Sequence, residues 1–316
     1  MNAHRFLLLG ASLWAALSIP NAIAAPPLLA FPSAEGYGRF ATGGRGGDVY
    51  QVTQLGDDGP GSLRVGIESA EGPRTIVFTV SGTILLKKAL RVENHNGLTI
   101  AGQTAPGDGV TLRDQTFQIK GSSNIIVRFL RFRLGDESKT SGDTRHLSQA
   151  KDVIFEHVTA TWGVDGTMDT DHLSNFTLQW SLFGEALHDS THHKEAHAML
   201  MSLRKTTGKV SIHNNLLFSS RNRHPTLGAV PDQPTGDGAL FNFRINVIYN
   251  WEDSLNLGVG QFSISEHAAI SNEDEFLEPE ELTQFVGLAG DSGGIADIAR
   301  EYFAADWAPV LVAEES

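Results

Sequence analysis

A short motif, two apolar residues flanking one variable position, recurs through the middle of the chain. Its six copies lie at residues 98–100, 125–127, 153–155, 176–178, 210–212 and 241–243. Successive copies are 27, 28, 23, 34 and 31 residues apart, with no convincing amphipathic helix between them. Alternating apolar positions indicate strands, and repetition at this interval is typical of a solenoid. The pattern therefore predicts an all-β fold, a right-handed single-stranded parallel β-helix.

The unequal spacing of the copies predicts where the chain varies in length. Stacked strands tolerate no insertion, so the extra residues must lie in the loops, where binding and catalytic sites are usually built. A β-propeller is the alternative architecture. Its blades need four strands in about 40 residues, and the units of this chain are shorter.

The N-terminus has the pattern of a secretory signal. Residues 1–5 are a short basic start, residues 6–19 are an apolar run, and Ala22-Ile-Ala24 is a small-residue cleavage site. The apolar run is too short to span a bilayer, so residues 1–24 are expected to be a signal peptide and not an anchor. We expect a secreted protein, extracellular or periplasmic, with no membrane association after cleavage. The chain has no cysteine, so its stability must come from the core and from bound ions.

The net charge of −13 is unevenly distributed. Residues 252–316 hold 15 acidic residues and one basic residue, whereas residues 1–251 hold 22 acidic and 23 basic residues. The body of the chain is thus nearly neutral and can accept a polyanion, although the overall charge suggests otherwise. The strand motif also ends near residue 252. We therefore expect a β-helix domain over residues 25–251 and an acidic, partly helical or weakly structured appendage over residues 252–316.

A glycine-rich stretch at residues 43–47 raises the possibility of a nucleotide-binding loop. No Gly-Lys-Ser/Thr sequence follows it, and no helix is indicated after it, so the phosphate-binding motif is incomplete. We expect a turn-rich segment that leads into the first strands, and no nucleic-acid partner.

Three aspartates lie close to the predicted strands. Asp165 and Asp169 are separated by Gly-Thr-Met, and Asp143 lies one coil earlier. A turn at Gly166 is expected to bring the first two carboxylates together, and stacked strands are about 4.8 Å apart, so that Asp143 can complete a triad. Carboxylate oxygens are the ligands that Ca2+ takes. The simpler interpretation is that the aspartates occupy surface turns, where their side chains bond the backbone.

Four histidines, at positions 188, 192, 193 and 197, form a rival cluster of candidate metal ligands. The sequence His193-Lys-Glu-Ala-His197 has its glutamate at the wrong position for a zinc protease, and the cysteines of a zinc deaminase are absent. We interpret the cluster as a loop of histidines beside the cleft, with zinc as the less favoured alternative.

An arginine-rich turn follows the strand at residues 212–218. In Arg221-Asn-Arg223-His-Pro225, the proline restricts the backbone and can hold Arg223 in a defined pose. Arginine is seldom a base, because its pKa is above about 12. By itself the segment is most simply a solvated basic turn.

Taken in order along the chain, several segments make it similar to the extracellular pectate lyase family. The matching segments cover roughly residues 31–251: FPSAEGYG from 31, GGRGG from 43, VTQLGDDGPGSLR from 52, IVFTVSGTI from 76, IAGQTAPGDG from 100, NIIVRFLRFR from 124, WGVD from 162 and NVIYNW from 246. This resemblance implies a right-handed parallel β-helix that cleaves α-1,4-linked polygalacturonate by Ca2+-assisted β-elimination, giving 4,5-unsaturated products.

The resemblance also implies roles for individual residues. Asp143, Asp165 and Asp169 resemble the calcium ligands of the family. Lys194 resembles the lysine that binds a substrate carboxylate, and Arg223 resembles the arginine that takes the C5 proton.

A second family arginine would fall at Gly228 in this chain. Its absence implies that Arg221, Arg204 or a neighbour binds the substrate instead, or that substrate binding is weaker. We expect the polysaccharide as the partner and a monomeric protein.

Two alternative functions are compatible with the sequence. A polygalacturonase-type hydrolase on a similar β-helix would use Asp165 and Asp169 as its paired carboxylates, but it leaves the Arg-x-Pro segment without a role. A non-catalytic, truncated glycan-binding homologue is suggested by the acidic C-terminal residues, where the family pattern is lost.

Overall fold

The computed structural model describes residues 27–193, 197–228 and 239–251, together with the strand residues 256–257, 261–265, 268–270 and 276–277. The predicted signal peptide and most of residues 252–316 lie outside the described residues. Within the described part of the chain, no helix combines the length and the apolar character needed to cross a membrane.

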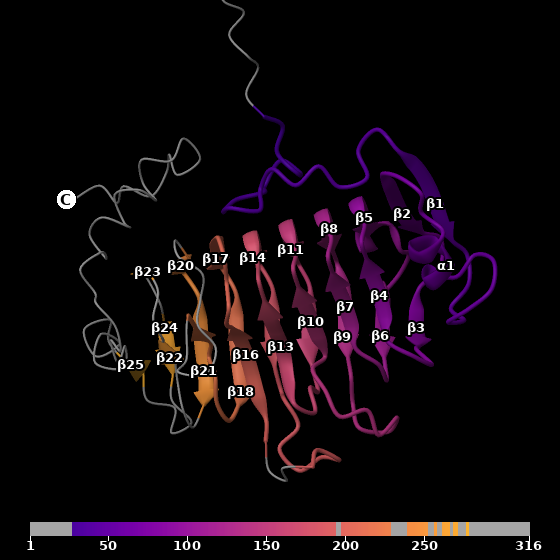
Figure 1. Cartoon of the computed structure of the whole chain (residues 1–316). Helices are drawn as coiled ribbons and strands as arrows, with labels where there is room; N and C mark the ends of the chain where they lie inside the picture. The colour runs from indigo at the N-terminus through magenta and orange to yellow at the C-terminus, as the bar shows by residue number, and fades with distance from the viewer. Residues whose placement is uncertain are drawn as a thin grey trace, which may run out of the picture.

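Three parallel sheets wind around one core (Figure 1). Sheet A consists of β1 (Asp48–Val52), β2 (Arg74–Phe78), β5 (Asn96–Ala101), β8 (Ser123–Arg128), β11 (Lys151–Glu156), β14 (Ser174–Gln179), β17 (Lys209–His213), β20 (Leu240–Arg244) and β23 (Gln261–Ser265). Sheet B consists of β3 (Gly82–Leu85), β6 (Val110–Arg113), β9 (Leu130–Arg133), β12 (Thr159–Thr161), β15 (Leu182–Gly184), β18 (Leu216–Ser220), β21 (Val247–Trp251), β24 (Ala268–Ile270) and β25 (Phe276–Leu277). Sheet C consists of β4 (Leu90–Glu93), β7 (Phe117–Lys120), β10 (Arg145–Ser148), β13 (Gly166–Asp171), β16 (Met199–Leu203), β19 (Thr226–Leu227) and β22 (Asn256–Leu257).

The predicted parallel β-helix is confirmed. All six copies of the sequence motif fall on strands of sheet A, from β5 to β20, and each pairs with the next in parallel. In this register Ile125, Val153, Phe176, Val210 and Phe241 stand on one another in successive coils. Helix is limited, among the described residues, to α1 (Leu63–Glu68) and the 3-10 turn η1 (Gly102–Thr104).

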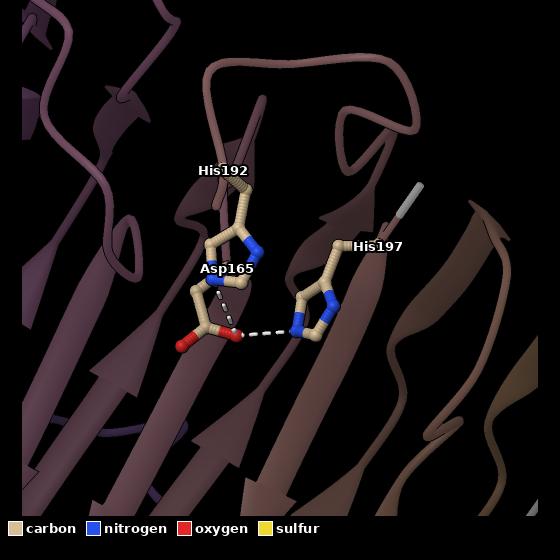
Figure 2. A group of neighbouring side chains, drawn as sticks. All are labelled: Asp165, His192 and His197. Atoms are coloured by element: carbon tan, nitrogen blue, oxygen red, sulfur yellow. Dashed lines mark hydrogen bonds and ion pairs between the residues drawn. The ribbon is translucent and has the colours of Figure 1, made fainter. Parts of the chain in front are cut away.

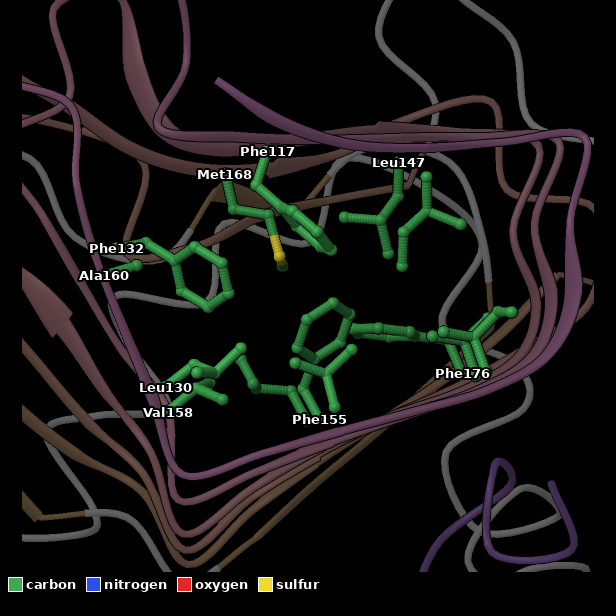
Figure 3. Packing of buried hydrophobic residues seen from close by; sticks show 14 of the residues in the cluster. Phe117, Leu130, Phe132, Leu147, Phe155, Val158, Ala160, Met168 and Phe176 are labelled. Atoms are coloured by element: carbon green, nitrogen blue, oxygen red, sulfur yellow. The ribbon is translucent and has the colours of Figure 1, made fainter. Parts of the chain in front are cut away.

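The interior of the solenoid is a continuous column of apolar side chains, seen in Figure 3. Aromatic residues from neighbouring coils meet there. The rings of Phe155 and Phe176 are 6.1 Å apart, and those of Phe117 and Phe132 are 5.1 Å apart. Each such side chain contributes about 1.5–3 kcal/mol by burial, so the coils hold together without disulfides.

One charged side chain lies inside this column. Arg145 of β10 is fully buried, and its guanidinium stands 4.4 Å from the ring centroids of both Phe155 and Phe183 and 5.0 Å from that of Phe132. Burial lowers the pKa of Arg145 to about 9. Contact with aromatic faces offsets part of the cost of burying its charge.

The N-terminal strap, residues 27–47, covers the outer face of sheet A. Its backbone bonds polar side chains of separate coils: Gly44 N–H donates to Thr99 Oγ1 of β5 (2.9 Å) and Gly38 N–H donates to Thr177 Oγ1 of β14 (2.8 Å). A Cβ on Gly38 would lie 2.3 Å from the carbonyl oxygen of Val153. The glycines of this stretch therefore allow backbone to lie directly on backbone.

The strand repeat extends beyond the boundary that the sequence predicted at residue 252. β22, β23 and β24 add a further strand to sheets C, A and B, and β25 then pairs with β24 in the antiparallel direction. The alternation in Gln261–Ser265 has the same form as the earlier motifs. It was hidden by the irregular spacing and by the acidic residues around it.

Candidate active site

Sheet C alternates apolar side chains toward the core with polar side chains toward the outside. In β13 Met168 is fully buried in the column, whereas Asp169 and Asp171 are half-buried on the outer face. The register of β10 places His146 beside Asp169. Because side chains alternate along a strand, neighbouring coils line up their polar residues on one face.

Asp143, His146 and Asp169 form one group, whose ligating atoms all lie within 4.8 Å of one another. Nδ1 of His146 is 3.7 Å from Oδ2 of Asp143. A Cβ on Gly166 would lie 2.6 Å from Oδ1 of Asp143, so the absence of a side chain there makes room for this carboxylate. The predicted approach of Asp143 and Asp169 from adjacent coils is observed.

The surroundings of Asp143 favour the protonated form of its carboxyl group. Burial raises its pKa to about 6, the negative charges of Asp169 and Asp165 add to the increase, and the nearby imidazole of His146 opposes it. The pKa of His146 is raised in turn, mainly by its interaction with Asp143. A cation placed among these carboxylates would relieve their repulsion.

The expected turn at Gly166 is replaced by a strand. Residues 166–171 form β13, paired with β10 on one side and β16 on the other. Asp165 lies in the bend just before β13 and Asp169 lies within the strand, so the chain does not double back between the two carboxylates. The sequence suggested a turn because glycine and aspartate are turn residues, but ladder pairing on both sides overrides that local preference.

Asp165 belongs to a second group, with two histidines (Figure 2). Its Oδ1 lies 2.6 Å from Nε2 of His197 and 3.9 Å from Nε2 of His192. Both histidines lie in the loop between β15 and β16 and are buried. Sequence reasoning treated them as a plain loop beside the cleft. It missed their pairing with Asp165, because the fold of an irregular loop leaves no period in the sequence.

Asp169 has a basic partner on the following coil. Nη2 of Arg204, directly after β16, lies 3.1 Å from Oδ2 of Asp169. Oδ1 of Asp169 accepts a hydrogen bond from the backbone N–H of Thr170 at 3.0 Å. Arg204, one of the predicted substrate-binding alternatives, thus lies at the carboxylate cluster.

Arg223 lies two strands beyond β13 on the same sheet. Asn222 pairs with Met199, and Thr226 pairs with Ser202. Between these two pairs the chain that leads into β19 has one residue more than β16, so it forms a bulge. Arg223 sits in this bulge with a left-handed backbone (φ 66°), and its carbonyl accepts from Met201 N–H at 3.0 Å. Two strand spacings place its backbone roughly 10 Å from β13.

The other two predicted substrate-binding residues lie differently. The backbone N–H of Arg221 donates to the carbonyl of Ala198 at 2.9 Å, and its side chain is exposed at the same end of sheet C. Lys194 lies outside the described residues, so its predicted role stays a prediction.

The donor set of the site fits Ca2+. Asp143 and Asp169 offer carboxylate oxygens from adjacent coils, and Asp165 contributes to the electrostatic field at Asp143. Oxygen ligands with net negative charge are what Ca2+ requires. The carboxylates are partly compensated by His146, His197 and Arg204.

Known proteins match both the sequence and the fold. The chain is 38% identical over 225 residues to a probable pectate lyase C of Emericella nidulans, covering 71% of this chain and 48% of that protein. It is 34% identical over 244 residues to a probable pectate lyase C of Aspergillus terreus, covering 77% and 52%. The chain thus spans about half the length of the curated relatives it matches. No family model matches it.

Two solved structures show the same architecture. The crystal structure of jun a 1, the major allergen from cedar pollen, aligns with a TM-score of 0.56 at 21% identity, covering 73% of this chain and 68% of that one. The pectate lyase pelN from Paenibacillus sp. 0602 aligns with a TM-score of 0.52 at 13% identity, covering 77% and 83%. The resemblance to the pectate lyase family is therefore confirmed over the β-helix, in sequence by the fungal relatives and in fold by the solved structures.

Proposed function

We propose that this protein is a secreted pectate lyase, which cleaves α-1,4-linked polygalacturonate by β-elimination with Ca2+ as its cofactor. The observation that carries the proposal is the gathering of Asp143 and Asp169, with Asp165 beside them, on the sheet that also bears Arg223. The relatives named pectate lyase C support the assignment. So does the fold shared with a Bacillus sp. N165 pectate lyase solved in complex with trigalacturonate (TM-score 0.50).

The residues of the site divide the work of the elimination. Asp143, Asp165 and Asp169 would hold Ca2+, which supplies Lewis-acid stabilisation of the charge that develops beside the substrate carboxylate. Lys194 and Arg221 bind and orient acidic sugar units. Arg223, in its neutral form, takes the C5 proton; the C4–O bond breaks, a C4–C5 double bond forms, and the departing oxygen takes a proton from solvent water. Activity should rise at alkaline pH, since a general base works best near its own pKa.

The bulge at Arg223 supports its assignment as the base. A residue in a regular strand of sheet C would point either into the core or straight outward, whereas the bulge re-aims the side chain. The hydrogen bond from Met201 N–H fixes the backbone of Arg223 to the neighbouring coil. The base is thereby held on the rigid solenoid and not on a free loop.

The decisive experiment compares turnover with and without a chelator. Purified protein is incubated with polygalacturonate, and the ultraviolet absorbance of the unsaturated product is recorded before and after EDTA. Absorbance that grows, stops with EDTA and returns with Ca2+ supports the proposal. Reducing ends released without ultraviolet absorbance would establish a hydrolase instead, and no cleavage at all would favour a glycan-binding protein.

A further inference from the structure

Two histidines and one aspartate converge at the edge of the proposed Ca2+ site. The ligating atoms of Asp165, His192 and His197 all lie within 4.8 Å of one another. Figure 2 shows both imidazoles turned toward the same carboxylate oxygen, Oδ1 of Asp165, while its second oxygen points away from them. The group is assembled from the residue that precedes β13 and from the loop between β15 and β16.

The loop holds its two imidazoles in place before any ion binds. Their rings are stacked, with centroids 4.2 Å apart and an interplanar angle of 22°. The backbone N–H of His197 donates to the carbonyl of His188 (3.2 Å), which closes the loop on itself. The N–H of Leu187 donates to the carbonyl of Gly163 (2.9 Å), which ties the loop to the segment between β12 and β13. His192 and His197 are only 5% and 7% exposed. Such restriction lowers the entropic cost of binding a ligand.

The chemistry of the group differs from that of its neighbour. Two imidazole nitrogens and one carboxylate oxygen suit zinc and other late transition metals, whereas Ca2+ takes only oxygen ligands. Metal bonds of about 2.0–2.2 Å in a tetrahedron place ligand atoms about 3.3 Å apart. The observed separations of 2.6 Å and 3.9 Å from Oδ1 of Asp165 bracket that value, so small side-chain rotations suffice, and a water completes the fourth position.

We propose that Asp165, His192 and His197 form a second metal site, selective for Zn2+ or a similar transition metal, which opposes Ca2+ at the adjoining site. Asp165 is shared between the two sites. A divalent ion on its Oδ1 withdraws negative charge from the carboxylates and repels a second cation nearby. Zinc should therefore raise the Ca2+ concentration needed for turnover, a consequence that rests on the proposed lyase function, whereas zinc binding itself does not.

Zinc binding is tested first, without reference to activity. Zn2+ is titrated calorimetrically into the full-length protein after its metals have been stripped, and the His192→Gln and His197→Gln variants are compared with the wild type. Each variant should weaken binding by more than about 100-fold, because even outer-shell partners of metal ligands cost 10- to 100-fold. His172→Gln is the matched control, since His172 pairs with a single carboxylate, Nδ1 to Oδ1 of Asp171 at 2.8 Å, and should leave the affinity unchanged.

The neighbouring group of Asp143, His146 and Asp169 provides the competing outcome. If His146→Gln abolishes zinc binding while His192→Gln and His197→Gln preserve it, the ion sits in that group and the proposal is overturned. A spectroscopic count of the imidazole nitrogens bound to the metal distinguishes the two candidate groups in the wild-type protein. Electron paramagnetic resonance of bound Cu2+ should report two imidazole nitrogens for the proposed site, and one nitrogen would contradict it.

The coupling between the ions is tested by activity. In the wild type, Zn2+ should shift the half-maximal Ca2+ concentration for lyase turnover upward by at least about tenfold, and saturating Ca2+ should restore the rate. The same Zn2+ should cause no shift in the His192→Gln/His197→Gln double variant. If zinc binds but leaves the Ca2+ dependence unchanged, the antagonism is refuted. If no lyase activity is found at all, the proposed function fails while the calorimetric result for zinc stands.

Discussion

Sheets A and C are built from the same repeat, yet their outer faces have opposite electrostatic character. On sheet A the buried carboxylate of Glu156 is met by Arg128, by Ser33 Oγ at 2.9 Å and by Gln179 Nε2 at 3.2 Å. At sheet C burial raises the pKa of Asp143 to about 6, the negative charges of Asp169 and Asp165 add to the increase, and His146 opposes it. On sheet A the carboxylate is fully paired within the fold. On sheet C the carboxylates are only partly paired with basic side chains and are available to a ligand.

The comparison teaches how a regular solenoid separates a structural face from a functional face. Parallel register aligns the outward side chains of neighbouring coils, so polar groups from different coils lie along one face of both sheets. On sheet A the N-terminal strap supplies backbone donors to that row. On sheet C acidic residues of neighbouring coils are brought together, which costs stability in the metal-free protein and creates a site that a cation can complete.

The largest expected effect is a loss of turnover that leaves the scaffold of sheet C intact. Arg223→Lys should lower turnover by about 10²–10⁴-fold, the usual contribution of a positioned base, while calcium binding and thermal stability stay unchanged. Arg91→Lys is the matched control, because Arg91 lies on β4 of the same sheet and bonds Gln118 at 2.8 Å, far along the solenoid from the site. Full activity in Arg223→Lys would remove Arg223 from the base role.

A pair of neutralising substitutions tests the contrast between the two faces directly. Glu156→Gln should destabilise the protein by about 3–5 kcal/mol, since it leaves Arg128 without its buried partner. Asp143→Asn should be neutral or stabilising in the absence of calcium, because it removes a buried carboxylate from the repulsion of Asp165 and Asp169.

Urea unfolding of both variants in EDTA measures these changes. Equal destabilisation by the two substitutions would show that the faces do not differ as described. Calcium binding should be lost only in Asp143→Asn.

The covering of sheet A by the strap is tested at Gly38, one of the positions where the two backbones lie close together. Gly38→Ala should cost about 1–3 kcal/mol, as overpacking usually does, because the new Cβ would lie 2.3 Å from the carbonyl oxygen of Val153. Gly72→Ala provides the control, since a Cβ there meets nothing within 4 Å, and it should leave the stability unchanged or slightly higher. Denaturant midpoints of both variants give the comparison, and an unaffected Gly38→Ala would mean that the strap does not lie directly on the sheet.

The smallest expected effect is a pH dependence confined to sheet C. Because the folded pKa of Asp143 is raised from 3.8 to about 6, the folded state holds the proton more tightly, and stability without metal should fall as the pH rises through that window. Added Ca2+ should reverse the trend, as it needs the ionised carboxylate. Melting temperatures with and without Ca2+ should therefore diverge by a few degrees above pH 6 and coincide near pH 4. A constant calcium effect across this range would exclude Asp143 as a ligand.

Much of the site was accessible from the sequence because it follows the strand period. Asp143 was predicted to lie one coil before Asp169, and the stacking of adjacent coils brings the two together even though the expected turn at Gly166 is a strand. The pairing of Asp165 with His192 and His197 was not accessible, since it depends on how an irregular loop folds back over β13. Lys194, which rests on family resemblance, lies outside the described residues.

The chain by itself determined the coils: apolar pairs at a recurring interval can be buried only by stacking, so the strands of sheet A follow from the pattern alone. Tertiary structure decided the rest. Gly166 lies in a strand because ladder bonds on both sides outweigh its turn preference, and the strap lies on sheet A through contacts such as Gly38 to Thr177, between residues 139 positions apart. Local patterns record what each segment must bury, but only the folded solenoid determines which distant polar groups meet.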